Sequence, residues 1–215
     1  MERVRVDVCG LSEVRWERHE HFTTLEDHTI VYSGDKVQGQ EGIAVWLHQR
    51  IAGTLIGYEP VNSRIVVVRL NAKPRCISLI QVYAPTAVSS EEQTQQFYQD
   101  LAATVRKIST NDILLIMGDF NAKVGNMSSA PVVGPGGLGE MNLAGEQLLD
   151  FCMDHNIILA ITPGLIITPD VCIHGHHQTQ ETKLTTSASQ SAGSQALTTA
   201  KHIQEPTVIL IIICW

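Results

Sequence analysis

The chain has 215 residues, of which 44% are hydrophobic and 17% are charged, enough for one large or two small globular domains. Its net charge of −7 excludes a global basic field that attracts nucleic acid, so a nucleic-acid partner would need a local site, held through a metal. Five cysteines without Cys-x-x-Cys spacing indicate reduced thiols in an intracellular protein, nuclear or cytoplasmic and not secreted. The longest apolar run, residues 208–215, is too short to span a bilayer, so no membrane partner is expected.

Five segments in the first part of the chain predict β-strands. They are residues 4–9, 28–34, 42–47, 64–70 and 75–83. The first alternates and is β-branched, which places Asp7 on its polar side. The last two are joined by a turn that contains Pro74 and therefore predict a β-hairpin.

Two helices and two further strands are predicted in the next part. Ser89 and Glu92 have the spacing of a capping box, and a helix follows to about residue 109 with apolar positions at Phe97, Leu101, Val105 and Ile108. A second helix follows the glycine-rich loop 132–140, and its buried face is expected to comprise Leu143, Leu148, Phe151 and Cys152. Apolar runs at 111–120 and 157–161 predict strands.

This order of elements is typical of an α/β chain with a largely antiparallel hairpin core flanked by helices. After about residue 162 the composition changes, and residues 178–201 are rich in Thr, Ser and Gln without a useful period. Such a segment cannot bury a core and is expected to be disordered. We therefore expect a domain over residues 1–161 and a disordered tail over residues 162–215.

Polar side chains follow three of the predicted strands, close to the point where each strand ends. Glu13 follows the first strand, Tyr83 closes the hairpin, and Asp119 and Asn121 follow the apolar run that begins at residue 111. We expect these side chains to converge on one rim of the sheet.

Metal-assisted phosphodiester hydrolysis is the chemistry that these residue types suit. Mg²⁺ prefers carboxylate oxygens and keeps several waters, so Glu13 can be its ligand. Asp119 can orient an attacking water or accept its proton, while Asn121 and Tyr83 can donate hydrogen bonds to phosphate. Taken singly, each residue also has a structural explanation: a solvated glutamate, a packed tyrosine, and an Asp-x-Asn turn whose side chains bond their own backbone.

Several segments, in this order, resemble the endonuclease/exonuclease/phosphatase family, in particular the endonuclease domain of non-LTR retrotransposons and the animal proteins named craniofacial development protein 2-like. They are LSEVRW, HTIVYSG, QVYAPT, FYQDL, LLIMGDFNAKVG and GLGEMNLAGEQLLDFC. The resemblance covers residues 3–161 and implies a two-sheet β-sandwich flanked by helices, with a site at the top that uses Mg²⁺ or Mn²⁺ and acts on DNA. By the same resemblance, Glu13 is a metal ligand, Tyr83 lies near phosphate, and Asp119 and Asn121 position the nucleophilic water and the phosphate.

Three elements of the family pattern have no match: a first strand that ends in Asn, a late Asn-x-Ile-Asp-Tyr segment, and a terminal Ser-Asp-His whose His acts on the nucleophilic water. We therefore expect a sandwich truncated at both ends and a chain that is catalytically incomplete as written. The alternative is a non-catalytic remnant or an interaction module.

The tail offers an explanation for the missing segments. When residues 167–187 and the last residues are back-translated and read from the third base of each codon, they can give the missing motifs in family order. Our hypothesis is that the reading frame slips near residues 161–166. On this hypothesis the histidines of HGHH, residues 174–177, are an accidental run and not a metal cluster, and the apolar run 208–215 results from shifted Asp and His codons.

Overall fold

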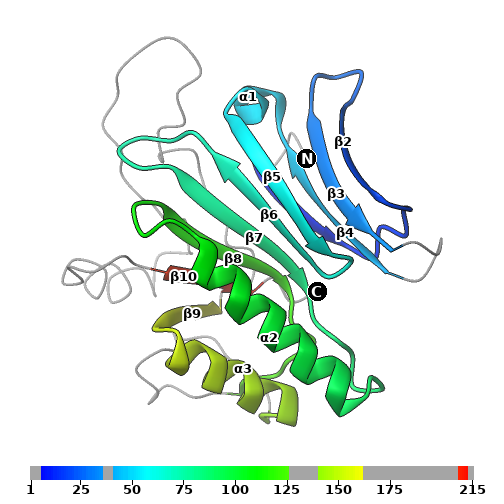
Figure 1. Cartoon of the computed structure of the whole chain (residues 1–215), viewed down its shortest axis with the longest axis vertical. Helices are drawn as coiled ribbons and strands as arrows, with labels where there is room; N and C mark the ends of the chain where they lie inside the picture. The colour runs from blue at the N-terminus through cyan, green and yellow to red at the C-terminus, as the bar shows by residue number, and fades with distance from the viewer. Residues whose placement is uncertain (1–5, 36–40, 126–139, 162–207, 213–215) are drawn as a thin grey trace.

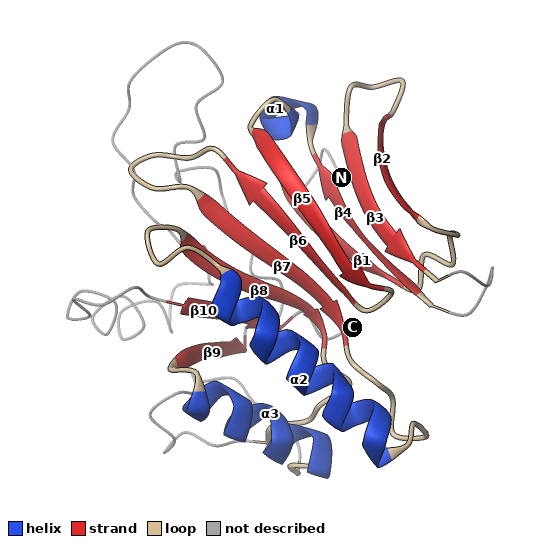
Figure 2. Cartoon of the chain, viewed as in Figure 1, coloured by secondary structure: helices blue, strands red, loops and turns tan. Residues whose placement is uncertain are grey.

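Two β-sheets pack face to face in the computed structural model, which describes residues 6–35, 41–125, 140–161 and 208–212. Helices α2 (Glu91–Lys107) and α3 (Leu143–Asp154) lie on the outer face of the larger sheet (Figure 1 and Figure 2). The fold is therefore an α/β two-sheet β-sandwich flanked by helices, as the family resemblance implies.

The smaller sheet has four antiparallel strands in the order β1-β4-β3-β2. Its strands are β1 (Val8–Ser12), β2 (His19–Thr23), β3 (Thr29–Gly34) and β4 (Gly42–Leu47). Short helix α1 (Gln49–Ala52) connects β4 to the larger sheet.

The larger sheet has six strands in the order β5-β6-β7-β8-β10-β9. They are β5 (Leu55–Asn62), β6 (Ile65–Leu70), β7 (Ile77–Tyr83), β8 (Ile113–Asp119), β9 (Ile157–Ile161) and β10 (Val208–Ile212). Strands β5, β6 and β7 are antiparallel, whereas β7, β8, β10 and β9 run parallel. Parallel strands carry their carboxyl ends to the same edge, which positions the candidate site described below.

Two apolar layers hold these elements together. The first lies between the sheets and contains Val45 and Leu47 of the smaller sheet with Leu79 and Met117 of the larger one. The second lies between the larger sheet and the helices, where Phe97 and Leu101 of α2 and Leu148 and Phe151 of α3 pack on Ile80 and Ile116. The larger sheet is thus covered on both faces.

Most predicted strands are confirmed, including β4 and β9 with the predicted bounds and the hairpin β6–β7. The first strand begins at Val8 and extends to Ser12, later than predicted. The placement of Asp7 on a polar side is wrong, because this side chain is buried and pairs with Arg50 at 2.6 Å. A buried carboxylate is tolerated only with such a partner.

Both predicted helices form, with two corrections. The capping box is built by Ser90 and Gln93, one residue later than the predicted Ser89 and Glu92. In α3, Leu148, Phe151 and Cys152 are buried as predicted. The prediction for Leu143 is wrong: it is the first residue of the helix, and its side chain is 70% exposed. None of the described helices has the length and apolar character needed to cross a bilayer.

Residues 208–212 are an exception to the disorder expected for 162–215, because they form β10 between β8 and β9. The loop residues 126–139, the histidine run 174–177 and the segment 178–201 lie outside the described residues. The boundary near residue 162 stays a prediction.

Candidate active site

The carboxyl ends of β7 and β8 bring Tyr83 and Asp119 side by side. The two residues are partners in the parallel ladder, and the backbone N–H of Ala84 donates to the carbonyl oxygen of Asp119 at 2.8 Å. Gly118 precedes Asp119 with φ of 144°, and a Cβ there would lie 1.9 Å from the Val82 carbonyl oxygen. Glycine is therefore required for the close approach of these strands just before the site.

Asn121 ties the turn that follows β8. Its backbone N–H donates to Asp119 Oδ1 at 2.8 Å, and its side-chain Nδ2 donates to the Ala84 carbonyl oxygen at 2.9 Å. Asp119 and Asn121 therefore form an Asp-x-Asn turn, which is the structural explanation given above for this motif. Within the described residues, Asp119 Oδ2 makes no further bond, so one carboxylate oxygen is left for a ligand.

Glu13 reaches the same rim from the other sheet. It follows the end of β1 with φ of 58°, and Tyr83 Oη donates to Glu13 Oε1 at 3.0 Å. The second oxygen, Oε2, lies 4.0 Å from Arg15 Nη2, and the Glu13 side chain is 59% exposed. One hydrogen bond thus joins the rims of the two sheets, and the second Glu13 oxygen has only the long ion pair with Arg15.

The electrostatic surroundings keep the Tyr83 hydroxyl protonated. Burial raises the pKa of Tyr83, and the hydrogen bond to Glu13 and the negative charges of Glu13 and Asp119 raise it further, against the opposing charge of Arg64. Both carboxylates are therefore close enough to act on the same phenol. A neutral tyrosine between two carboxylates is a hydrogen-bond donor at neutral pH.

Sequence reasoning missed Arg64, which precedes β6 and lies beside Tyr83. Its Cζ is 5.4 Å from the centroid of the Tyr83 ring, and its Nη1 donates to the Tyr83 carbonyl oxygen at 3.2 Å. Its Nη2 forms an ion pair with Glu41. The signal available in the sequence was its position at the start of the hairpin strand, opposite the end of β7.

The donor set fits a hard divalent cation. Mg²⁺ is held in proteins by one or two carboxylates together with waters and substrate phosphate, and Glu13 and Asp119 supply carboxylate oxygens of that kind. No group of three or more His, Cys, Asp or Glu side chains able to hold a metal occurs in the ranges that the structure describes.

The chain matches, over residues 1–191, the family model described as endonuclease/exonuclease/phosphatase family. The chain belongs to this family. It is 35% identical over 162 residues to craniofacial development protein 2 of Bos taurus and equally similar to that of Tragulus javanicus. The aligned part is 75% of this chain but 27% of the bovine protein and 28% of the Tragulus protein, so the chain spans less than a third of these relatives.

The comparison with solved structures gives partial matches. The endonuclease domain of TRAS1, a telomere-specific non-LTR retrotransposon, is 19% identical with a TM-score of 0.46, over 60% of this chain and 52% of that one. A 3′ phosphatase from Neisseria bound to product DNA hairpin is 17% identical with a TM-score of 0.42, over 56% and 49% of the two chains. A family protein from Leptotrichia buccalis is 14% identical with the same TM-score, over 67% and 60%.

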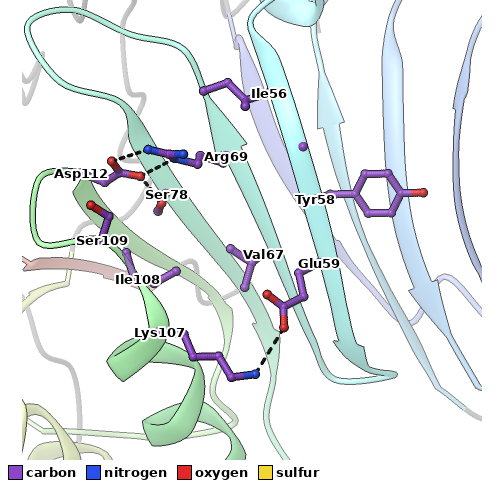
Figure 3. A pocket seen from close by; sticks show the side chains of 11 residues that line it. Ile56, Tyr58, Glu59, Val67, Arg69, Ser78, Lys107, Ile108, Ser109 and Asp112 are labelled. Atoms are coloured by element: carbon purple, nitrogen blue, oxygen red, sulfur yellow. Dashed lines mark hydrogen bonds and ion pairs between the residues drawn. The ribbon is translucent and has the colours of Figure 1, made fainter.

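A groove of about 290 Å³ lies at the other end of β7, on the side that α2 covers (Figure 3). Its charges are already paired: Asp112 accepts from Arg69 Nε at 2.7 Å and from Ser78 Oγ at 2.7 Å, and Lys107 lies 3.4 Å from Glu59. Because these charged groups pair with one another, we interpret the groove as a structural contact between the strands and helix α2.

Proposed function

We propose that the rim formed by Glu13, Tyr83, Asp119 and Asn121 binds Mg²⁺ or Mn²⁺ and a phosphate of DNA, and that the chain as written does not complete phosphodiester hydrolysis. The site would then descend from a retroelement-type DNA endonuclease. The observation that carries this proposal is the 3.0 Å bond between Tyr83 Oη and Glu13 Oε1, next to Asp119, which gathers donors and acceptors from both sheets.

Each side chain has a role that its environment supports. Glu13 offers Oε2 as a metal ligand, and a bound cation supplies charge neutralisation for phosphate and its leaving oxygen. Tyr83, whose raised pKa keeps its proton, has a single O–H; on phosphate binding it would turn this donor from Glu13 Oε1 to a phosphate oxygen, which would leave both Glu13 oxygens to the cation. Asp119 orients a water through Oδ2, while the Asn121 amide, which has two N–H groups and uses one on Ala84, donates the other to phosphate.

The proposed lack of turnover rests on the missing proton acceptor. The sequence contains no Ser-Asp-His, the motif whose His acts on the nucleophilic water in the family that this chain resembles. Losing a positioned general base lowers rates about 10²–10⁴-fold. Binding of cation and phosphate does not depend on that base, so binding and hydrolysis separate.

Two measurements on the full chain test the proposal. Mn²⁺ binding followed by electron paramagnetic resonance is expected to weaken at least about tenfold in Glu13→Gln, through the lost carboxylate ligand. Glu26→Gln, which changes an 82% exposed carboxylate away from the rim, is the matched control. Equal Mn²⁺ binding by wild type and Glu13→Gln would reject the metal site and favour a non-catalytic remnant.

Nicking of supercoiled plasmid in Mg²⁺ is the second measurement, and none is expected. Nicking that Asp119→Ala abolishes would instead establish an active endonuclease. Sequencing the transcript and gene across codons 155–175 tests the proposed frame slip, since a single-base change that restores one frame would give a protein with the missing Asp and His.

A further inference from the structure

The loop from Glu13 to Arg18, here called the rim loop, connects β1 to β2 and has an unusual backbone. Glu13, Arg15 and Arg18 have φ of 58°, 50° and 66°, in the left-handed region that residues with a Cβ disfavour. These three residues therefore have a left-handed backbone that is unfavourable by itself, so contacts with the surrounding structure must stabilise it.

Two glycines at the ends of neighbouring strands make room for this loop. A Cβ at Gly34 would lie 1.7 Å from the Trp16 carbonyl oxygen, and a Cβ at Gly42 would lie 3.1 Å from Val14 Cγ2. Backbone bonds then fasten the loop, from Val14 N–H to the Gly42 carbonyl oxygen at 3.1 Å and from Gly34 N–H to the Arg18 carbonyl oxygen at 2.6 Å. The rim loop is thus fixed against the smaller sheet.

Trp16 is the side chain that this arrangement presents. Its ring meets Tyr32 edge-on at 5.1 Å between centroids and Phe22 at 5.8 Å, which fixes the indole from one side. It nevertheless remains 39% exposed, and Phe22 beside it is 42% exposed. An aromatic ring that is held by neighbours and open to solvent is suited to stack on a planar ligand.

The position of Trp16 on the loop that also carries Glu13 indicates the class of ligand. Arg15 and Arg18 lie on either side of Trp16 in the sequence, and Arg15 Nη2 is 4.0 Å from Glu13 Oε2. Exposed acidic residues alternate with these arginines at positions 13, 17 and 20, so the loop carries charges of both signs. An exposed aromatic ring on a loop with arginines suits a nucleobase that stacks on the ring while guanidinium groups reach its phosphates. The rim loop also contains Glu13, three positions before Trp16, so such a strand would be continuous with the candidate active site.

We propose that Trp16 is a stacking platform for an unpaired base of single-stranded DNA, next to the phosphate bound at the rim. A base within a duplex already has its faces covered by its neighbours, so the platform distinguishes single-stranded from double-stranded DNA. The position of this strand rests on the proposed function, whereas the stacking itself does not.

Fluorescence anisotropy of a labelled 12-mer of thymidine, and of a duplex of the same length, tests the proposal with the full chain in Mg²⁺. Trp16→Ala is expected to weaken single-strand binding about tenfold and duplex binding much less. Trp16→Phe keeps an aromatic face and is expected to bind within about threefold of wild type. Trp46→Phe, in the same sheet but packed between His28 and His48, is the matched control and is expected to bind like wild type.

Single-strand binding that is equal in Trp16→Ala and wild type would overturn the proposal, as would equal losses for single strand and duplex. If Trp16→Ala unfolds, quenching of indole fluorescence by the oligonucleotide, lost in Trp16→Phe, provides the same test. Mn²⁺ binding separates the two proposals. Trp16-dependent binding without a Glu13-dependent Mn²⁺ site leaves the platform and rejects the proposed function, and the reverse result rejects the platform alone.

Discussion

The two sheets differ in how much of their surface the protein covers. Every residue of β7 in the larger sheet is buried, since the helices cover one face and the smaller sheet covers the other. Every residue of β2, an edge strand of the smaller sheet, is exposed, including Phe22, and the Trp16 ring is open beside it. Strand β4 of the same sheet is buried against the larger sheet, so the contrast is between the packed centre of the sandwich, which supplies stability, and the β2 edge, which is free to contact a ligand.

The candidate site lies where these two regions meet. Tyr83 and Asp119 come from the buried sheet, and their positions are fixed by the parallel ladder. Glu13 and Trp16 come from the rim loop of the exposed sheet, which glycines and backbone bonds hold in place. The site thus combines the ends of β7 and β8, which the ladder holds in place, with a loop whose exposed side chains can be mutated without changing the core.

The largest expected effect comes from truncating an apolar side chain in each sheet. Ile80 is fully buried between the larger sheet and the helices, so Ile80→Ala should lower the free energy of unfolding by about 2–5 kcal/mol. Phe22→Ala, at a 42% exposed position, should lower it by less than about 1.5 kcal/mol. Urea denaturation of both variants measures the difference, and equal losses would mean that the exposed β2 edge contributes to stability as much as the packed centre.

The same difference explains which strands the sequence predicts. The buried strand β4 and the strand β9, in which Ile157 and Leu159 are buried, are continuous apolar runs, and their bounds follow directly from hydrophobicity. Strand β2, HEHFT, is exposed throughout and has no hydrophobic pattern. Strand β5 contains Gly57 and Pro60, which lie at its two register shifts. Because glycine and proline are typical of turns, the sequence did not predict this strand.

The candidate site could be predicted in part. The sequence places Glu13, Tyr83 and Asp119 after strand ends, and the structure brings them to one rim as expected. Their chemical roles stay predictions. The contact of Arg64 with Tyr83 was missed, although its position at the start of the hairpin strand was a signal. The rim loop could not be found, because its conformation depends on close approach at Gly34 and Gly42.

A second prediction concerns the ion pair that fastens the start of β8. Asp112 accepts from Arg69 Nε and Nη2 at 2.7 and 3.0 Å and from Ser78 Oγ at 2.7 Å (Figure 3). Asp112→Ala leaves the buried Ser78 hydroxyl without its acceptor and should cost about 1–3 kcal/mol, in the lower part of that range because Arg69 is half-exposed and can be hydrated.

The pH dependence of stability provides a check on this carboxylate. The hydrogen bond from Arg69 lowers the pKa of Asp112, and the bond from Ser78 lowers it further. A carboxyl whose pKa is lower when folded stabilises the protein above its unfolded pKa of about 3.9, and this contribution is lost as pH falls through the folded pKa. The stability difference between wild type and Asp112→Ala should therefore shrink in urea denaturation at pH 3. A constant difference would contradict the ion pair.

The smallest expected effect concerns Gln81, which faces the layer between the two sheets. Its side chain is 1% exposed, and its Nε2 donates only a long 3.4 Å bond to the Val82 carbonyl oxygen. Its Oε1 has no partner among the described residues. Strand β1 comes so close that a Cβ at Gly10 would lie 2.0 Å from this oxygen. A buried acceptor without a partner lowers stability, so this position is a weak point between the sheets.

Gln81→Leu should therefore raise the free energy of unfolding by about 1 kcal/mol, since it replaces the unpaired carboxamide with an apolar group of similar size. Gln99→Leu, at an exposed position of α2, is the matched control and should change stability by less than about 0.5 kcal/mol. Urea denaturation measures both. A loss of stability in Gln81→Leu would mean that the carboxamide has a bound water as its partner, because ordered water satisfies buried polar groups of this kind. The contrast between the sheets would then need revision, since the layer that joins them would be held by a polar contact as well as by apolar packing.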